Sequence, residues 1–456
     1  MAGIITELEK DMALFCIECA KRLGASGSRV SLSKNVLDSV SFFNGELDKV
    51  THAADRSIYL YIFADGKYGT FSTNRIEKED LSAFIEKAVA TVKMLEKDEC
   101  RQLPQKDRLA NDALTGVETG LYDEKYFDED IDSRIERVRK MSIFNSLKSD
   151  GTYSLISEEC NWSDSVEDTL LIDSQGLEAR HIETSAGCFC EMNVADAEGN
   201  KYSGYWWDSS FSTEMVDTEG CPAKALEKVL KQMGPKRSRG GYCNMVIDSS
   251  AASKLVSPII NALNASSIQQ KMSFLEGTKG KKIFPENLTI EDRPRDKGLL
   301  GARYYDSEGV ATENRAIINK GVVTDYFINT YLSKKTGWAP TIEDISRPVM
   351  TPFIDGTEAS KVSEVSLEDL LKASVNGFYI TGFNGGNCNP VTGDFSFGVE
   401  GFKFSKGRIT HPIKEMLITG NILELWNKLT GVGSDARPCT RWQIPSLAFK
   451  EVSFSS

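Results

Sequence analysis

The side chains that most often hold a catalytic metal are scarce and widely separated in this sequence. Its three histidines are His52, His181 and His411, and none lies within one helical turn of another. A zinc site takes about three protein ligands, and a helix with two histidines one turn apart commonly supplies two of them. We therefore predict no histidine-based metal site and no bound cofactor.

The ten cysteines show no zinc-binding arrangement either. Cys16 and Cys19 have C-x-x-C spacing, but they fall in a helical pattern and no second C-x-x-C completes a four-thiolate site. Cys188 and Cys190 alternate on a predicted strand and so share one face, where packing explains them better than redox chemistry. Cysteines spread thinly over the chain are typical of reduced thiols in a cytoplasm.

A strand running into a helix, at YCNMVIDSSAASKLVSPIINALNASS from residue 242, is the usual platform of a hydrolase. This helix carries no His, Glu or Cys, and the segment has no G-x-S-x-G motif. Ser250 and Lys254 are four residues apart, one more than in the S-x-x-K spacing. Serines before an apolar helical period are ordinary helix caps. The platform therefore lacks evident catalytic side chains, and we predict no catalytic residue.

A glycine- and asparagine-rich segment, YITGFNGGNCNPVTGDFSFGVEGF at residues 379–402, is the most unusual stretch. Glycines permit close backbone approach, and Asn, Thr and Asp side chains can form hydrogen bonds within a turn or bind a polar ligand. These residues are compatible with an elaborate hairpin connection and with a peptide-binding loop. In the second case, the residues expected to contact substrate are Asn387, Asn389, Thr392, Gly393, Asp394 and Ser396.

The composition is that of a soluble globular protein, with 40% hydrophobic and 26% charged residues among 456. The net charge of −12 argues against a nucleic-acid surface, and no apolar run approaches the roughly 20 residues of a membrane helix. The N-terminus lacks the basic start and apolar stretch of a signal peptide. We therefore expect a cytoplasmic protein that binds neither nucleic acid nor membrane.

Helical and hairpin patterns are interleaved without a βαβ rhythm, which predicts an α+β fold. Asp65-Gly66 marks one hairpin turn, and a short helix is expected near residues 421–430. The first helix should bury one stripe, made of Leu8, Met12, Phe15, Cys19 and Leu23. A Gly/Pro/basic linker near residue 234 divides a mixed α/β N-terminal domain, 1–233, from a strand-rich C-terminal domain, 234–456.

Four segments, in the same order along the chain, resemble one protein family. NPVTGDFSFGVEG resembles the glycine-rich signature of the PmbA/TldE branch of the TldD/PmbA family, whose members are called candidate modulators of DNA gyrase. MSFLEGTKGKKIFPENLTIEDRP resembles its central segment, YYDSEGVATENRAIINKGVVTDYF its D-x-E-G-V-x-T hairpin, and SLAFKEVSF its last strand. The resemblance covers essentially the whole chain and is clearest from about residue 236.

The resemblance implies a two-domain, cytoplasmic, dimer-forming protein tied to proteolysis. In the sister TldD branch, a His-Glu-x-x-x-His helix and a Cys near the C-terminus bind a catalytic metal. The corresponding window here is LVSPIINAL at residues 255–263, and Cys439 is the candidate relic of the metal-binding Cys. The chain is then expected to be inactive alone, to form a homodimer when isolated, and to serve a TldD-type subunit that cuts extended peptides such as peptide-antibiotic precursors.

Two other functions are compatible with the residues. A self-sufficient hydrolase would use Cys439, or Ser250 with Lys254. A binding protein that acts on DNA gyrase would need no catalysis, as the name given to the family suggests.

Overall fold

The computed structural model describes residues 3–147, 151–356 and 364–456. Contacts divide the chain into two compact units. The first comprises Met1–Val229, Pro294–Glu313 and Ile328–Glu343, and the second comprises Leu230–Arg293, Asn314–Phe327 and Asp344–Ser456. Helices and antiparallel strands are mixed in both units, which confirms the α+β class. In the described part of the chain, no helix is long and apolar enough to cross a membrane.

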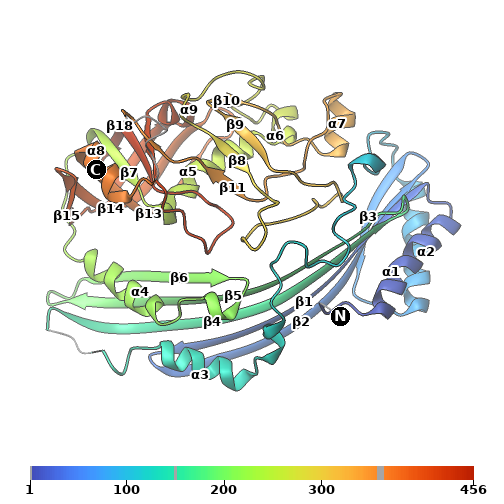
Figure 1. The fold of residues 1–456 in the computed structure, drawn as a ribbon, viewed down its shortest axis with the longest axis horizontal. Coiled ribbons are helices and arrows are strands. Elements are labelled where there is room, and N and C mark those ends of the chain that lie inside the picture. Colours follow the sequence, from blue (N-terminus) through green and yellow to red (C-terminus); the bar gives the residue numbers. More distant parts are fainter. Residues whose placement is uncertain (1–2, 148–150, 357–363) are drawn as a thin grey trace. The chain divides into compact units, whose positions relative to one another are not determined.

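The first unit is built on a six-stranded antiparallel sheet in the order β3-β2-β1-β4-β5-β6 (Figure 1). The central strand β4 has period-two burial, because every second side chain from Glu158 to Leu170 is buried and those between them are not. Asp65 and Gly66 both take positive φ and close the predicted hairpin. The strands are β1 (Gly27–Phe43), β2 (Glu46–Ala64), β3 (Lys67–Thr73), β4 (Tyr153–Asp173), β5 (Glu178–Asp196) and β6 (Lys201–Ser210).

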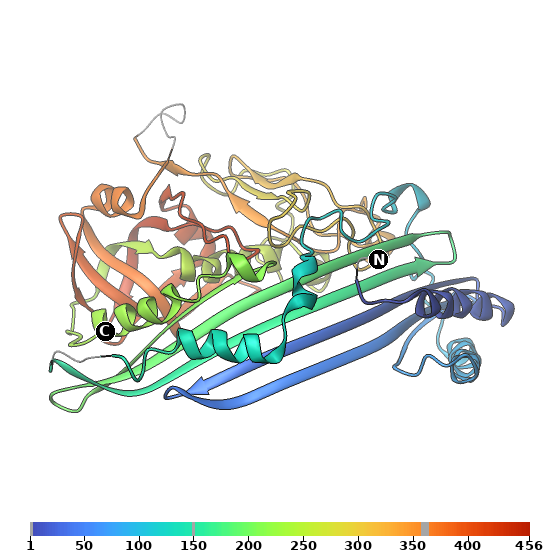
Figure 2. The ribbon, with the colours of Figure 1, turned by 60° about the horizontal axis from the view of Figure 1, so that its bottom comes forward.

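Helices cover the buried face of this sheet. Two of them, α1 and α2, lie side by side and pack on β1 and β2, and α3 lies along β1 and β4 (Figure 2). On β6, Gly204 is so close to α4 that an added Cβ would be 2.6 Å from the nitrogen of Val229. The helices are α1 (Glu7–Arg22), α2 (Lys78–Met94), α3 (Ile131–Met141), α4 (Gly220–Lys231) and, later in the chain, α7 (Thr330–Thr336).

The first turn of α1 departs from the predicted apolar stripe. Leu8 is 68% exposed, so the prediction that it is buried is wrong, whereas Glu9 is 5% exposed. Glu9 lies 3.1 Å from Lys34 Nζ and 3.2 Å from Arg56 NH1. Burial raises the pKa of Glu9, but hydrogen bonds from Thr6 and Lys34 outweigh burial and lower it overall. The ion pairs of Glu9 with Lys34 and Arg56 therefore determine which side of α1 faces the sheet.

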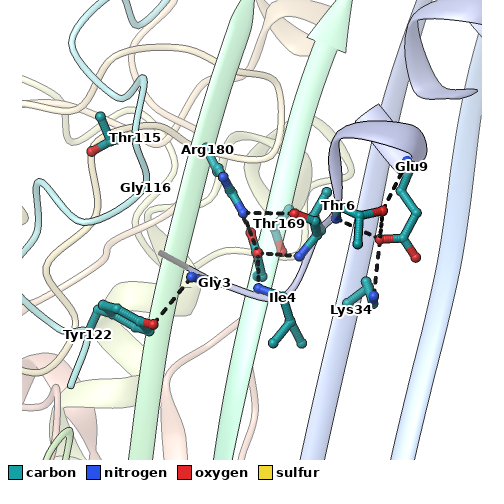
Figure 3. Close-up of polar contacts among 12 residues, drawn as sticks. Gly3, Ile4, Thr6, Glu9, Lys34, Thr115, Gly116, Tyr122, Thr169 and Arg180 are labelled. Carbon is teal, nitrogen blue, oxygen red and sulfur yellow. Dashed lines mark hydrogen bonds and ion pairs between the residues drawn. The ribbon is translucent and has the colours of Figure 1, made fainter. Parts of the chain in front are cut away.

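Residues 3–9 are tied to the sheet by buried polar contacts (Figure 3). The backbone N–H groups of Ile4 and Ile5 each donate a 2.8 Å hydrogen bond to Oδ2 of Asp168 on β4. Arg180 on β5 donates to both oxygens of the same carboxylate, at 2.9 and 2.7 Å. A fully buried aspartate thus joins the N-terminal segment to two strands.

The second unit contains an eight-stranded sheet in the order β12-β17-β18-β16-β14-β13-β7, with β15 on β14. An additional pairing between β18 and β7 closes five strands into a ring. The strands are β7 (Gly241–Ile247), β12 (Phe353–Ile354), β13 (Asn376–Cys388), β14 (Asp394–Ser405), β15 (Arg408–Pro412), β16 (Met416–Asn421), β17 (Leu429–Val432) and β18 (Leu447–Ser455). A smaller sheet contains β8 (Ile290–Asp292), β9 (Arg315–Asn319), β10 (Val322–Val323) and β11 (Pro348–Met350).

Among the described residues of this unit, the helices are α5 (Ser249–Ala262), α6 (Ala265–Gln269), α8 (Leu367–Ser374) and α9 (Ile422–Trp426). The predicted helix near 421–430 is too long, because α9 ends at Trp426 and β17 begins at Leu429. The Trp426 ring packs edge-on against Phe449, and its Nε1 donates to the carbonyl of Leu255 in α5 at 3.3 Å. Tertiary packing of one tryptophan therefore ends the helix.

The ion pair between Arg134 and Asp164 yields a stability prediction. Their side chains are 5% and 1% exposed, and Arg134 makes three hydrogen bonds of 2.8–3.1 Å to the carboxylate. Arg134→Ala leaves a buried charge unpaired and should lower the free energy of unfolding by about 3 kcal/mol or more, measured by urea denaturation. Arg139→Ala, on the same helix but 58% exposed, is the control and should cost less than about 1 kcal/mol. Equal losses at the two positions would contradict this assignment.

Asp306 yields a prediction about pH. It is buried and accepts hydrogen bonds from the N–H groups of Glu308, Val310 and Glu343, while burial and the Glu308 charge raise its pKa to about 6. Because the folded state binds this proton more tightly than the unfolded chain, ionisation of Asp306 costs stability as pH rises from about 4 to about 6. The full cost is about 3 kcal/mol.

Asp306→Asn removes this titration, and urea denaturation at pH 4 and pH 7 measures the effect. The variant should gain stability relative to the parent chain between the two pH values. Asp107→Asn, at an exposed aspartate of the same unit, is the matched control. Its free energy of unfolding should differ from that of the parent by the same amount at both pH values. A pH-independent difference for Asp306→Asn would refute the expected titration.

Candidate functional site

The three histidines are held at separate places. On β2, Nδ1 of His52 lies 2.7 Å from Asp38, and on β5, Nε2 of His181 lies 3.3 Å from Glu183. On β15, His411 contacts the hydroxyl of its own neighbour, Thr410. The three imidazoles therefore lie on three different strands, and each has its own local partner.

The junction of β7 and α5 is organised around Asp248, which caps the helix. Its carboxylate accepts the backbone N–H of Ser250 at 3.0 Å and the Ser250 hydroxyl, and the Tyr379 hydroxyl donates to the other oxygen. Burial and the adjacent Asp248 charge raise the pKa of Tyr379. The Lys254 ammonium instead lies 5.4 Å from the centroid of the Phe397 ring. Ser250 and Lys254 are thus directed to different partners.

Neither Tyr379 nor Asp248 stands out in the sequence as a member of this cluster. The signal for Asp248 is its position directly before an apolar helical period, which is typical of an N-cap. Tyr379 lies 131 residues further along the chain, and only the parallel pairing of β13 with β7 brings it to the helix start. The arrangement is a helix cap with a buried phenol.

The window 255–263 of α5 is packed into the core. Leu255, Val256, Ile259, Ile260 and Leu263 are at most 3% exposed, and the helix continues through Pro258. In the described ranges of the second unit, no three His, Cys, Asp or Glu side chains bring ligand atoms within 4.8 Å of one another. Cys439 is buried, with 5% of its surface exposed. The residues present therefore do not fit the metal site that the resemblance describes for the sister branch.

Four of the six predicted substrate-contacting residues lie inside a turn. Asn389 Oδ1 accepts from the N–H of Val391 at 2.9 Å, and Thr392 Oγ1 donates to Asp394 Oδ2 at 2.7 Å. Asn421 adds a 3.0 Å bond to Asp394 Oδ1, and hydrogen bonds from Asn421 and Thr392 lower the pKa of Asp394. Gly393 is buried, with φ at +79°. These four residues build the connection between β13 and β14.

Asn387 and Ser396 are placed differently. Both are exposed, and they lie directly opposite each other on β13 and β14. The strand β13 also has an unpaired stretch. Its pairing with β7 ends at Ile380 and covers only Gly377–Ile380. Within the described chain, residues 381–388 therefore pair with a strand on one side alone, which leaves a sheet edge beside the exposed Asn387.

Comparisons with known proteins match all parts of this fold. Three family models match: PmbA/TldA metallopeptidase domain 1 at residues 29–92, the central domain at 124–233 and the C-terminal domain at 240–456. Metalloprotease PmbA of Escherichia coli O157:H7 is 24% identical over 94% of this chain and 92% of its own length. The Haemophilus influenzae PmbA homolog, also named a metalloprotease, is 25% identical over 97% and 94%.

Solved structures agree with this match. A candidate modulator of DNA gyrase from Bacteroides thetaiotaomicron has a TM-score of 0.92 and 35% identity, covering 99% of this chain and 100% of its own. TldE from Thermococcus kodakarensis shares the fold, with a TM-score of 0.82 and 17% identity over 98% and 100% of the two chains. The chain belongs to the PmbA/TldD metallopeptidase family.

Proposed function

We propose that this chain is a non-catalytic subunit of a heteromeric metallopeptidase. The observation that supports this most strongly is the apolar packing of α5 at the window where the sister branch carries its metal ligands. Replacing buried ligands by Leu, Val and Ile removes the donors that a divalent cation needs and adds core packing in their place. Relatives named metalloproteases indicate peptide hydrolysis as the activity to which the chain contributes.

The alternative of a self-sufficient hydrolase has little geometric support. A serine nucleophile needs a base that takes its proton, but the Ser250 hydroxyl donates to the helix-capping Asp248 while Lys254 lies over an aromatic ring. A reactive thiolate needs an exposed, electropositive setting, and Cys439 is 5% exposed. The chain therefore acts through a partner, a TldD-type subunit that carries the metal, and it forms a homodimer when isolated.

The free edge of β13 is the place where this subunit contacts an extended peptide. An added strand gains main-chain hydrogen bonds along residues 381–388, and exposed side chains beside the edge give selectivity. Asn387 and Ser396 are the exposed polar pair next to this edge, whereas Asn389, Thr392, Gly393 and Asp394 hold the turn that positions it. Peptide-antibiotic precursors are one class of flexible substrate that fits such an edge.

Mixing the purified chain with a TldD-type partner tests the subunit role. We expect cleavage of an unfolded peptide only when both chains are present, and a chelator should stop it, because the partner carries the metal. Ser250→Ala and Cys439→Ala should leave cleavage unchanged. Chelator-resistant cleavage by this chain alone, or equal cleavage by the partner alone, would refute the proposal. A stable complex with DNA gyrase and no effect on the partner would favour the gyrase-binding alternative.

The pair Asn387 and Ser396 tests the peptide contact. Asn387→Ala with Ser396→Ala should weaken binding of a labelled extended peptide to the mixed complex about fivefold to tenfold, as expected for about 1 kcal/mol of lost hydrogen bonding, measured by fluorescence anisotropy. The matched control is Asn376→Ala with Ser405→Ala, an Asn/Ser pair in register at the other end of the same strands. Equal weakening by both pairs would place the peptide elsewhere.

A further inference from the structure

Three carboxylates are buried on the helix-covered face of β4. Glu158, Asp164 and Asp168 are all at most 2% exposed. Asp164 is paired with Arg134 at 2.8 Å, and Asp168 with Arg180 at 2.7 Å. A buried carboxylate without a counter-charge costs several kcal/mol. Two of the three are thus neutralised by an arginine.

Glu158 differs, because no Lys, Arg or His in the described residues forms an ion pair with it. Its carboxylate is held by two hydrogen bonds, from the Ser142 hydroxyl and from the backbone N–H of Ile143 at 2.9 Å. Both donors lie directly after the end of α3. The carboxylate is therefore oriented, as ligating carboxylates are, but its charge is not matched by a protein cation.

Two thiols stand beside Glu158 in place of an arginine. Cys160 follows it by two residues on the same face of β4, and Cys190 lies directly opposite Cys160 on β5. The two Sγ atoms are 3.4 Å apart, and one oxygen of Glu158 and both sulfurs lie within 4.8 Å of one another. Zinc bound by two sulfurs and one oxygen holds such atoms about 3.4 to 3.8 Å apart. Small side-chain adjustments bring the three groups to these separations.

A second thiol pair borders the first. Cys188 lies two residues from Cys190 on the same buried face of β5. The thiol of Cys221 in α4 donates a 3.4 Å hydrogen bond to the carbonyl of Trp206, which lies opposite Cys190 on β6. All four cysteines are free and at most 3% exposed.

We propose that Glu158, Cys160 and Cys190 form a buried site for a thiophilic divalent cation, Zn²⁺. A fourth ligand would come from Cys188 or Cys221 after a side-chain movement, because neither sulfur lies within 4.8 Å of all three groups. Thiolate and carboxylate ligands are a donor set that zinc accepts, and binding displaces the thiol protons to solvent. The ion would place a positive charge directly against the Glu158 oxygen, where its neighbours have an arginine, although the thiolate ligands keep the site negative overall. It would also join β4, β5 and α4, so its role is structural. The site lies in the first unit, away in sequence from the window of α5.

Metal analysis of the intact purified chain tests the proposal. Because the ligand atoms are buried, the ion must enter during folding, so the chain is expressed with added zinc, or unfolded with a chelator and refolded with ZnCl2 alone. The parent chain should retain about one zinc per chain after dialysis. Cys160→Ser with Cys190→Ser should retain almost none, and Glu158→Gln should bind more weakly. Cys16→Ser with Cys19→Ser, at another buried thiol pair, is the matched control and should keep the parent's zinc.

Refolding with Co²⁺ gives a second measurement that does not depend on zinc counts. The parent chain and the Cys16/Cys19 control should show thiolate-to-cobalt charge-transfer absorption, and the Cys160/Cys190 variant should lose it. Circular dichroism identifies any variant that fails to fold, and Glu158→Gln then carries the test. Three results would each overturn the proposal. The parent chain could contain no zinc, or its zinc content could be unchanged by the Cys160/Cys190 substitutions. Mass spectrometry could also show a mass lower by two hydrogens, which would indicate a Cys160–Cys190 disulfide.

Discussion

The need to neutralise carboxylates buried beneath helices organises the first unit. A long sheet covered on one face would ordinarily bury only apolar side chains there, yet β4 alone places three acids on that face. Two of these acids are paired with an arginine and fix different parts of the chain: Asp164 holds α3 through Arg134, and Asp168 holds the N-terminal segment and β5. Glu9 does the same from the helix side. Breaking such pairs costs far more than losing an exposed one, so these contacts specify how the helices sit on the sheet.

The core of the second unit is held together mainly by apolar packing. Its ring of strands and the apolar side of α5 bury Leu, Val, Ile and Trp side chains with few ionised groups. Where the resemblance to the TldD branch implies imidazoles and a carboxylate, this helix buries apolar side chains. Polar ligands in a core are costly unless a metal satisfies them, and an apolar replacement removes that cost together with the chemistry. Under the proposed function, this apolar helix belongs to a subunit that supports binding rather than hydrolysis.

Features that depend only on neighbouring residues could be predicted from the sequence. The Asp65-Gly66 hairpin depends on positive φ at two adjacent residues, and the shared face of Cys188 and Cys190 depends only on strand alternation. The burial of Leu8 was predicted wrongly, because Lys34 and Arg56 on other elements decide which side of α1 faces the sheet. The helix near residue 421 was overextended, because contacts of Trp426 with distant residues end it.

The candidate sites show the same division. The Gly/Asn segment was recognisable from composition, but only the hydrogen bonds separate Asn389, Thr392 and Asp394, which build the turn, from the exposed Asn387 and Ser396. The grouping of Glu158 and Cys160 with Cys190 depends on the register of β4 and β5, which join residues 30 apart in sequence. Alternation shows that each residue faces inward, yet it cannot show which inward-facing residues meet.

A metal in this protein would not by itself indicate a peptidase. Catalytic zinc keeps a coordination position open to water, whereas a structural ion is closed by four protein ligands. The thiol cluster is buried beneath α4 and offers no path for a peptide, so an ion there has no substrate to polarise. Conversely, hydrolysis would require donors at the α5 window, where the side chains are apolar. The two sites lie in different units and use different residues, so zinc content and peptide cleavage report on independent properties. Only a metal whose removal abolishes cleavage by the isolated chain would connect them.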